Sequence, residues 1–229
     1  MSGIVGSKLN IRGSGLVGSL GTDGQHLLSA GAGKTNVFET VSAGGAWTLI
    51  KTLTSDGSDA SFVFVNGTDD VVFDGTYLVY QFRWQTIHPE TDEAIFGFQV
   101  SEDTGSSYGV ASTQTSRRHY NKDAAPANQN IDNGTINTTG GTTELTFNSH
   151  VGNDADQSQG GHLDFYNPAS TTYSKMWNAF CPNYTSNDYI NFHMMGGIIM
   201  TTSAVDAIRF QFNTGEIQGG TVSMYGLTT

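Results

Sequence analysis

The chain has 229 residues, of which 37% are hydrophobic and only 14% are charged, against about 25% charged residues in an average soluble domain. This length suits one domain with a buried core, and the single cysteine, Cys181, excludes an internal disulfide. The net charge of −11 opposes nucleic acid as a partner, because phosphate contacts need a basic surface. No apolar run is long enough to predict a membrane span, and the N-terminus lacks the pattern of a secretory signal.

Residues 1–38 are the first predicted unit, a glycine-rich arm. The arm holds three cations against Asp23, a local charge of +2, which leaves −13 for residues 39–229. Because glycines interrupt every apolar run, the arm cannot build a core, and we expect an extended segment that becomes ordered on a partner. The residues predicted to make this attachment are Lys8, Arg12, Gly13, Gly15, Leu16, Val17, Gly18, Gly21, Gly24, Leu27 and Leu28.

From residue 39 onward the apolar residues follow a period of two, which predicts strands. A first set of predicted strands covers residues 47–51, 61–65, 71–73, 77–84 and 95–100, and a second set covers 143–147, 162–166, 189–192, 198–201, 207–212 and 220–225. Asn-Gly and Asp-Gly pairs in the first set supply the positive φ of tight hairpin turns. Residues 39–229 are therefore predicted to form an all-β body, an antiparallel β-sandwich of jelly-roll type.

Between the two sets, residues 101–142 are polar and show no clear period. A stretch of this length is either functional or mobile. It contains the basic cluster of the body, which consists of Arg117, Arg118, His119, Tyr120 and Lys122. We expect an exposed excursion from the sandwich that includes one or two edge strands.

Motifs for nucleotide binding and catalysis lack their structural context. Residues 13–18 match G-x-G-x-x-G, but no buried strand precedes them and no helix can follow. The chain has no H-E-x-x-H pair, and the carboxylates around Glu90 and Glu102 lie beside turn signals. We predict no catalytic residue, no cofactor and no enzymatic activity.

Asp154 and Asp156 offer alternating oxygen donors in a polar turn. The spacing is not that of an EF-hand, because Phe165 stands where the closing glutamate would be. We therefore predict no metal site, while a looser calcium site near these two residues is an alternative that the sequence leaves open.

The aromatic residues are the remaining candidates for ligand contact. Alternation along the strands places most of them in the core, so only those in predicted loops could stack on a sugar. These are Tyr108, Tyr120, Tyr173, Trp177 and Tyr184. They make a carbohydrate-binding β-sandwich module, with a cell-surface glycan as its partner, an alternative function.

Both ends of the chain resemble bacteriophage proteins. Residues 21–33, GTDGQHLLSAGAG, resemble a short element common in tail fibres and related virion proteins. The longer opening is similar to openings of structural proteins of marine tailed phages, and residues 204–227 resemble the closing β-hairpin of the same phage proteins.

The resemblance implies a component of the virion surface, made in the host cytoplasm and usually a β-rich homotrimer, whose partners are other capsid or tail proteins. It implies no catalytic residues. We expect a non-enzymatic structural protein, either a capsid-surface decoration or a head-fibre subunit, because a single modest body is unlike the long shaft of a fibre. A tail-fibre or receptor-binding protein is the alternative.

Overall fold

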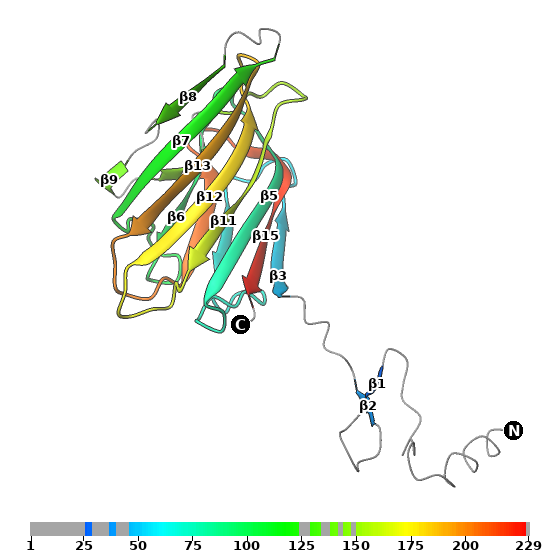
Figure 1. The fold of residues 1–229 in the computed structure, drawn as a ribbon, viewed down its shortest axis with the longest axis vertical. Coiled ribbons are helices and arrows are strands. Elements are labelled where there is room, and N and C mark those ends of the chain that lie inside the picture. The colour runs from blue at the N-terminus through cyan, green and yellow to red at the C-terminus, as the bar shows by residue number, and fades with distance from the viewer. Residues whose placement is uncertain are drawn as a thin grey trace, which may run out of the picture. The chain divides into compact units, whose positions relative to one another are not determined.

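The computed structural model describes residues 26–28, 37–39, 46–123, 129–133, 138–141, 144–147 and 150–227. The chain divides into two units, residues 1–45 and residues 46–229. In the first unit, β1 (His26–Leu28) pairs with β2 (Val37–Glu39) in antiparallel fashion. All further strands belong to the second unit, the body (Figure 1). None of the described segments is a helix long and apolar enough to cross a membrane.

The body consists of two antiparallel sheets. The larger has nine strands: β3 (Trp47–Thr54), β5 (Val79–Pro89), β7 (Ser112–Lys122), β8 (Gln129–Asn133), β9 (Thr138–Gly141), β11 (Gln159–Tyr166), β12 (Lys175–Tyr184), β13 (Tyr189–Ile199) and β15 (Ile217–Leu227). Its order is β3-β15-β5-β11-β12-β13-β7-β8, and β9 also pairs with β7. The smaller sheet comprises β4 (Phe62–Val65), β6 (Phe96–Ser101), β10 (Leu145–Thr146) and β14 (Ala207–Phe212), in the order β10-β6-β14-β4.

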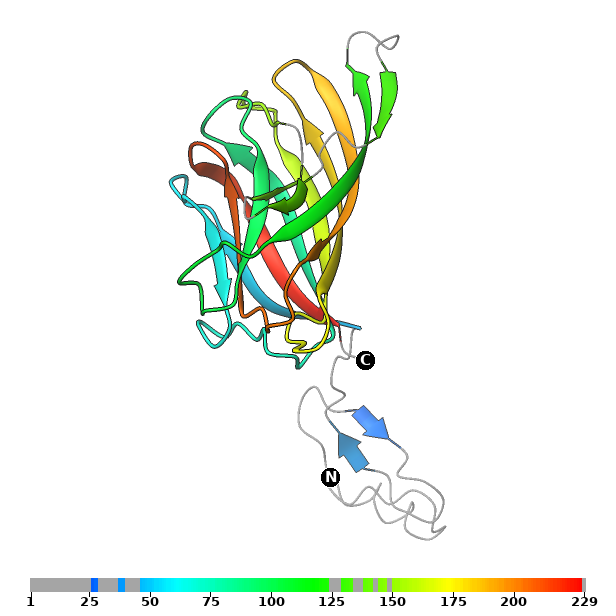
Figure 2. The same cartoon turned by 90° about the vertical axis from the view of Figure 1, so that its left-hand side faces the viewer.

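The strand order confirms the predicted jelly roll. The eight strands of the jelly roll, numbered along the chain, are β3, β4, β5, β6, β10, β11, β14 and β15; successive strands change sheet except β6 and β10, which pair in the smaller one. The larger sheet takes the first, eighth, third and sixth of them, and the smaller takes the fifth, fourth, seventh and second. This is the two-sheet Greek-key arrangement of a jelly roll. Figure 2 shows the two layers.

Five strands are additions to the eight-stranded jelly roll, and all of them extend the larger sheet. β7, β8 and β9 are inserted between β6 and β10, and β12 and β13 are inserted between β11 and β14. They continue the sheet beyond β11. The smaller sheet receives no added strand, so the two layers differ in width.

The core between the sheets is rich in aromatic rings. Phe64 of the smaller sheet lies edge-on to Phe82 of the larger, with ring centroids 5.5 Å apart. Phe98 meets Trp177 in the same way, at 5.1 Å, and Trp84 lies 4.5 Å from Phe147. Such pairs contribute about 0.5 to 1.5 kcal/mol each beyond the area that they bury, so they hold the layers together at several points.

Several predicted strands differ from the observed ones. Residues 71–73 form a loop, although Val71 and Phe73 are buried in the core. Residues 189–192 and 198–201 belong largely to one long strand, β13. The excursion at 101–142 contains β7, which is paired with β13 on one side and with β8 and β9 on the other. β7 is therefore an integral strand of the sheet, and β8 and β9 form its edge.

The C-terminal segment corrects another expectation. Residues 204–227 were expected to form a closing hairpin, but they contain β14 and β15, which lie in different sheets. β14 pairs with β4 and β6, whereas β15 pairs with β3 and β5. The segment crosses from one layer to the other because the jelly-roll order requires it.

Lys175, at the start of β12, fixes two loops at one end of the body. Its side chain is 1% exposed. Its Nζ donates hydrogen bonds to the carbonyl oxygens of Ser170, Tyr173, Thr201 and Ser203, three of them at 2.6 to 3.2 Å. A buried ammonium is tolerated only when it is well hydrogen-bonded, and these carbonyls provide that.

Glu144, just before β10, has a largely buried carboxyl group at the edge of the smaller sheet. Burial raises its pKa from 4.5 to about 7, although a hydrogen bond with Gln211 and the charge of Arg209 act in the opposite direction. Its Oε1 has no hydrogen-bond partner among the described residues. Since folding favours the protonated form, the contribution of Glu144 to stability is greatest below pH 4.5 and is lost as the pH rises through 7.

We predict that Glu144→Gln raises the free energy of unfolding at pH 8 by on the order of 2 kcal/mol relative to the unchanged chain, because an amide there never ionises. At pH 4 the two proteins should unfold at similar denaturant concentrations. Urea titrations at both pH values test this. Equal stability of the two proteins at pH 8 would show that Glu144 carries no such penalty.

Candidate functional site

Most of the predicted attachment residues lie outside the described residues. This applies to Lys8, Arg12, Gly13, Gly15, Leu16, Val17, Gly18, Gly21 and Gly24. Leu27 and Leu28 lie on β1, and their side chains are also outside the described part.

One predicted ligand-contact aromatic is wrong. Trp177 was expected in a loop but lies in the middle of β12, where it is 3% exposed and packs on Phe98. A Cβ at Gly197, on the neighbouring strand, would come within 2.8 Å of the indole ring, so this glycine leaves room for the tryptophan. Trp177 is a core residue and cannot contact a surface ligand.

The other four candidates do not converge on one site. Tyr108 lies in the loop after β6 beneath the guanidinium of Arg209, whose Cζ is 4.3 Å from the ring centroid. Tyr173 is in the loop before β12 and is 71% exposed. Tyr184 is the last residue of β12, and its hydroxyl donates to Asp123 Oδ2 at 3.4 Å. Tyr120 lies on β7, with its ring 5.6 Å from that of Tyr189.

Asp154 and Asp156 lie in an exposed turn. The turn is closed by a hydrogen bond from the backbone N–H of Gln157 to the carbonyl oxygen of Asp154, at 2.8 Å. Within the described ranges no three His, Cys, Asp or Glu side chains come close enough to hold a metal ion. The structure thus assembles no group of acidic ligands at this turn.

The most unusual surface of the body is the outer side of the larger sheet, the side turned away from the smaller sheet. Eight apolar side chains there each expose 38% to 59% of their surface. We call this surface the outer face, and its residues are Ile131, Tyr166, Met176, Ile190, Phe192, Met194, Ile198 and Met200.

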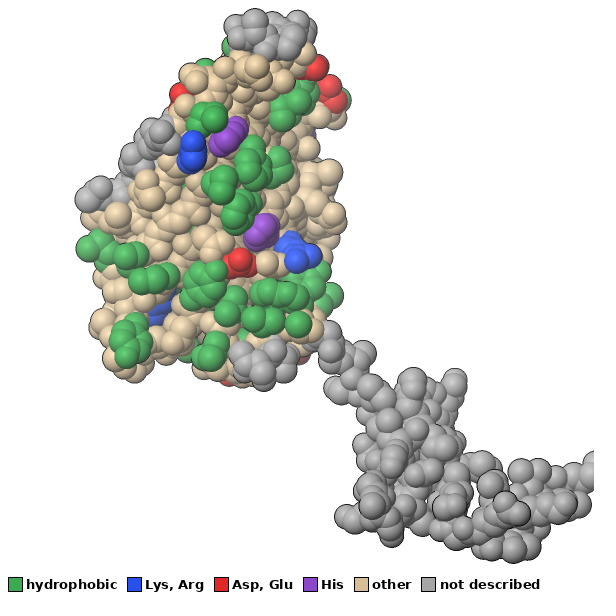
Figure 3. All heavy atoms as spheres, in the orientation of Figure 1, with side chains coloured by type: hydrophobic (Ala, Val, Ile, Leu, Met, Phe, Trp, Pro, Cys, Tyr) green, Lys and Arg blue, Asp and Glu red, His purple; other side chains and the backbone are tan. Residues whose placement is uncertain are grey.

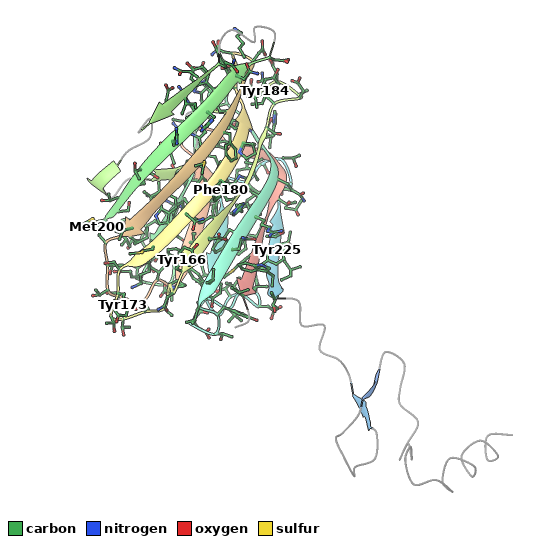
Figure 4. All side chains as sticks on the ribbon, viewed as in Figure 1. Tyr166, Tyr173, Phe180, Tyr184, Met200 and Tyr225 are labelled. Atoms are coloured by element: carbon green, nitrogen blue, oxygen red, sulfur yellow. The ribbon has the colours of Figure 1, made fainter. Side chains whose placement is uncertain are left out.

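Strand register places these side chains together. Tyr166 is opposite Met176, and Met176 is opposite Ile198. Farther along the same strands, Met194 is opposite Phe180. Figure 3 shows the hydrophobic groups spread over β11, β12 and β13, and Figure 4 shows Tyr166, Phe180 and Met200 on these strands or at their ends.

A polar row divides the outer face into two apolar areas. Asp164 on β11 lies opposite Asn178 on β12. Gln81 Nε2 donates to Asp164 Oδ1 at 2.6 Å, and the hydroxyl of Tyr166 donates to Asn178 Oδ1 at 2.5 Å. The polar side chains of this row therefore satisfy one another and leave the apolar areas on either side without partners.

The distribution of residues in the first part of β13 is inverted relative to an ordinary surface strand. Ile190 and Phe192 are exposed, whereas Asn191 and His193 between them are 2% and 0% exposed. A sheet with one face in water normally has apolar residues inside and polar residues outside. The inversion indicates that the exposed side of β13 is built to be covered.

The upper end of the outer face is hollowed. A depression of about 590 Å³ is lined by His119, Ile131, Ile190 and Phe192 among others. These residues come from three neighbouring strands, β7, β8 and β13. The hollow could accept a protruding side chain from a partner.

The area of the outer face is large for a surface in water. Since a large apolar side chain offers about 200 Å² when fully exposed, the eight residues leave on the order of 700 Å² in contact with water. The largest apolar patch on a typical monomer is about 300 to 600 Å², and a stable interface buries about 800 Å² on each partner. The outer face is therefore close to the size of an interface.

The sequence carries a signal for the outer face that is ambiguous without the structure. Residues 190–194 of β13 read INFHM, with apolar residues at alternate positions and polar ones between them. Period two predicts a strand here but does not tell which set of residues faces the core. Only the register with β7 and β12 shows which side faces the core.

No protein-family model, no curated protein and no solved structure matches this chain. The function is therefore inferred from its own residues and geometry.

Proposed function

We propose that this protein is a non-enzymatic structural component of a bacteriophage virion surface and that it assembles with further copies of itself through the outer face. The assembly is inferred from the outer face, whose eight apolar side chains expose on the order of 700 Å², near the amount that a stable interface needs. Exposed apolar surface of this extent on one side of a folded domain indicates an interaction site, here with two apolar areas on either side of a polar row.

A second copy of this chain is the occupant that the outer face fits best. The charged residues in and around the face have both signs, with Asp164 on β11 and Arg117 on β7. Identical copies can therefore bring opposite charges together at the edges of the contact. The proposed assembly is a homotrimer, in which three equivalent contacts close a ring. The number three comes from the resemblance to phage proteins.

The virion setting rests on the resemblance at the two termini, and the fold is compatible with it. Jelly rolls form capsid proteins and also lectin domains, so the fold alone does not decide between these roles. Within the virion setting we propose a capsid-surface decoration or head-fibre subunit. The second candidate is a receptor-binding or carbohydrate-binding role, which is favoured by a pocket with tyrosines and cations on the opposite side of the larger sheet.

We predict that the purified protein has a mass of three times 24.5 kDa in solution and that Met194→Asp reduces it to a single chain. A carboxylate in the middle of the outer face would have to be buried without a partner, which costs several kcal/mol. Multi-angle light scattering at micromolar concentration measures the mass.

Val63→Asp is the matched control. Val63 lies on β4 in the smaller sheet and is 37% exposed, against 40% for Met194. The control should keep the mass of the unchanged protein, and circular dichroism should show that both variants are folded. A monomeric wild type, or dissociation by Val63→Asp as well, would rule out the outer face as the contact.

The role in the virion has a separate test. Gold-labelled antibodies against the body should bind the head of the phage that encodes this chain. Label over the tail would support the fibre alternative instead, and particles without label would contradict a role in the virion.

We further propose that residues 1–38 attach the body to the particle. Their local charge is +2 while residues 39–229 carry −13, so the arm is better suited to an acidic neighbouring protein than the body is. Deleting residues 2–38 should leave a folded body that is absent from purified virions. Incorporation of the truncated protein at the wild-type level would show that attachment lies in the body.

A further inference from the structure

The inner side of β7 and β13 carries a pocket of about 360 Å³ beyond the part of the sheet that the smaller sheet covers. Its main lining residues are Arg118, Tyr120, Lys122, His150, Tyr189 and Asn191. We call it the inner pocket. Its volume lies within the range of small-molecule sites.

Strand register builds the pocket from alternate residues of two paired strands. Lys122 lies opposite Tyr189, Tyr120 opposite Asn191, and Arg118 opposite His193. Residues two apart on a strand share one side of the sheet, so all six side chains are on the inner side. This side is opposite to the one that carries Phe192 and Met194.

Two tyrosine rings form an aromatic corner in the pocket. The rings of Tyr120 and Tyr189 meet edge to face, with centroids 5.6 Å apart. Arg118 Cζ lies 4.7 Å from the centroid of Tyr120, and Lys122 Nζ lies 5.2 Å from that of Tyr189. Aromatic rings with amides and charged groups beside them combine a surface for C–H groups with many hydrogen-bonding atoms. Sugars present both kinds of group.

The two cations of the pocket, Arg118 and Lys122, have N–H donors without partners among the described residues. Arg118 uses Nη2 in an ion pair with Asp132, at 2.6 Å, but its buried Nε has no partner in the described part of the chain. Lys122 forms no ion pair with any described carboxylate. Lys122 can therefore donate to an acidic group of a ligand, with the positive charge of Arg118 beside it, and charge-assisted hydrogen bonds of this kind are the stronger ones.

His193, opposite Arg118 on β13, is a second side chain beside the pocket whose hydrogen-bonding atoms lack partners. It is 0% exposed, and neither ring nitrogen finds a hydrogen-bond partner among the residues that the structure describes. Burial, together with Arg118 and His150, lowers its pKa to about 4, so the ring is neutral at pH 7. A buried polar group without a partner costs about 1 to 3 kcal/mol, and a bound molecule or ordered water would remove that cost.

Most of the carboxylates around the pocket already form an ion pair or accept hydrogen bonds from residues other than Lys122. Asp132 pairs with Arg118, and Asp123 accepts from the hydroxyl of Tyr184. Glu93 accepts from Ser186 Oγ, at 3.1 Å, and from Asn187 Nδ2, at 3.4 Å. Asp188 precedes Tyr189 in the turn between β12 and β13. Lys122 is thus the cation in the pocket that no described carboxylate neutralises.

We propose that the inner pocket binds a sugar that bears a carboxylate, with the sugar ring against Tyr120 and Tyr189 and the carboxylate at Lys122 and Arg118. Asn191, together with Asn187 and Thr185 at the rim, supplies donors and acceptors for the ring hydroxyls. The inference goes beyond the proposed assembly, because it concerns the opposite side of the sheet.

The test compares ligands that differ in one group. Methyl β-D-glucuronide and methyl β-D-glucoside share the ring, and only the first has the carboxylate. We expect the glucuronide to bind about tenfold more tightly, in the millimolar range, and sodium acetate to bind more weakly than the glucuronide. Titrations of the full chain followed by NMR give the three dissociation constants.

Substitutions of its lining residues test whether the sugars bind in the inner pocket. Lys122→Met should weaken glucuronide binding about tenfold and leave the glucoside unchanged, while Lys122→Arg should retain most of the affinity. Tyr189→Leu should weaken both sugars. Lys51→Met is the matched control, since it removes the same charge from β3 of the same sheet and should change nothing.

The outcomes that overturn the proposal are specific. Equal affinity for glucuronide and glucoside would exclude recognition of the carboxylate. Equal affinity for acetate and glucuronide would show a simple anion site. No saturable binding of the glucuronide, or the same loss from Lys51→Met as from Lys122→Met, would exclude the inner pocket.

Discussion

The difference in width between the two sheets is the constraint on which the rest of the molecule depends. A four-stranded sheet packs against one whose path contains eight strands, with β9 attached as a ninth. With strands about 4.8 Å apart, the four additional strands make the larger sheet roughly 20 Å wider than the smaller one. The aromatic core lies between the two sheets and reaches Trp177 on β12. The parts of the added strands that the smaller sheet does not cover need another environment on each side.

Several residues of the added strands depart from the usual pattern, in which apolar side chains face inward and polar side chains face outward. On the inner side, where no second sheet follows, β7 and β13 carry Arg118, Tyr120, Lys122 and Asn191, which tolerate water or a polar ligand. On the outer side β13 carries the apolar side chains of Ile190, Phe192 and Met194. Covering on the order of 700 Å² at about 25 cal/mol per Å² would release on the order of 15 kcal/mol before the cost of association. That cost is about 4 to 15 kcal/mol, so contacts of this size suit a reversible or cooperative assembly.

The sequence predicted the eight jelly-roll strands better than the added ones, and the reason is physical. Strands of the jelly roll have a clear apolar side, as in β14, where Phe210 and Phe212 are buried and Gln211 lies between them. β12 has no such contrast, because Lys175 and Asn183 are buried and Phe180 lies on the outer side. It also contains Pro182, which argues against a central strand. The pairing between β11 and β12 skips Pro182, so the proline is tolerated.

The candidate sites, like the added strands, could be predicted from the sequence only in part. Sequence reasoning named the basic cluster at 117–122 and Tyr120, and the structure places Arg118, Tyr120 and Lys122 on one side of β7 and Arg117 and His119 on the other. Tyr189 and His193 were not connected with them, because the register between β7 and β13 joins residues about 70 positions apart and no local pattern reveals it. Trp177 was misplaced because its neighbours did not read as a strand.

The two proposed activities support each other because they use opposite sides of the same strands. A contact through the outer face leaves the inner pockets of all copies open. A single sugar held by a few charge-assisted bonds and two tyrosine rings binds weakly. Several pockets fixed in one assembly would engage neighbouring sugars of a surface glycan, and avidity can then exceed the single-site affinity by about 10² to 10⁴. The apolar face and the inner pocket are in this way two consequences of one structural fact, the extension of the larger sheet beyond its partner.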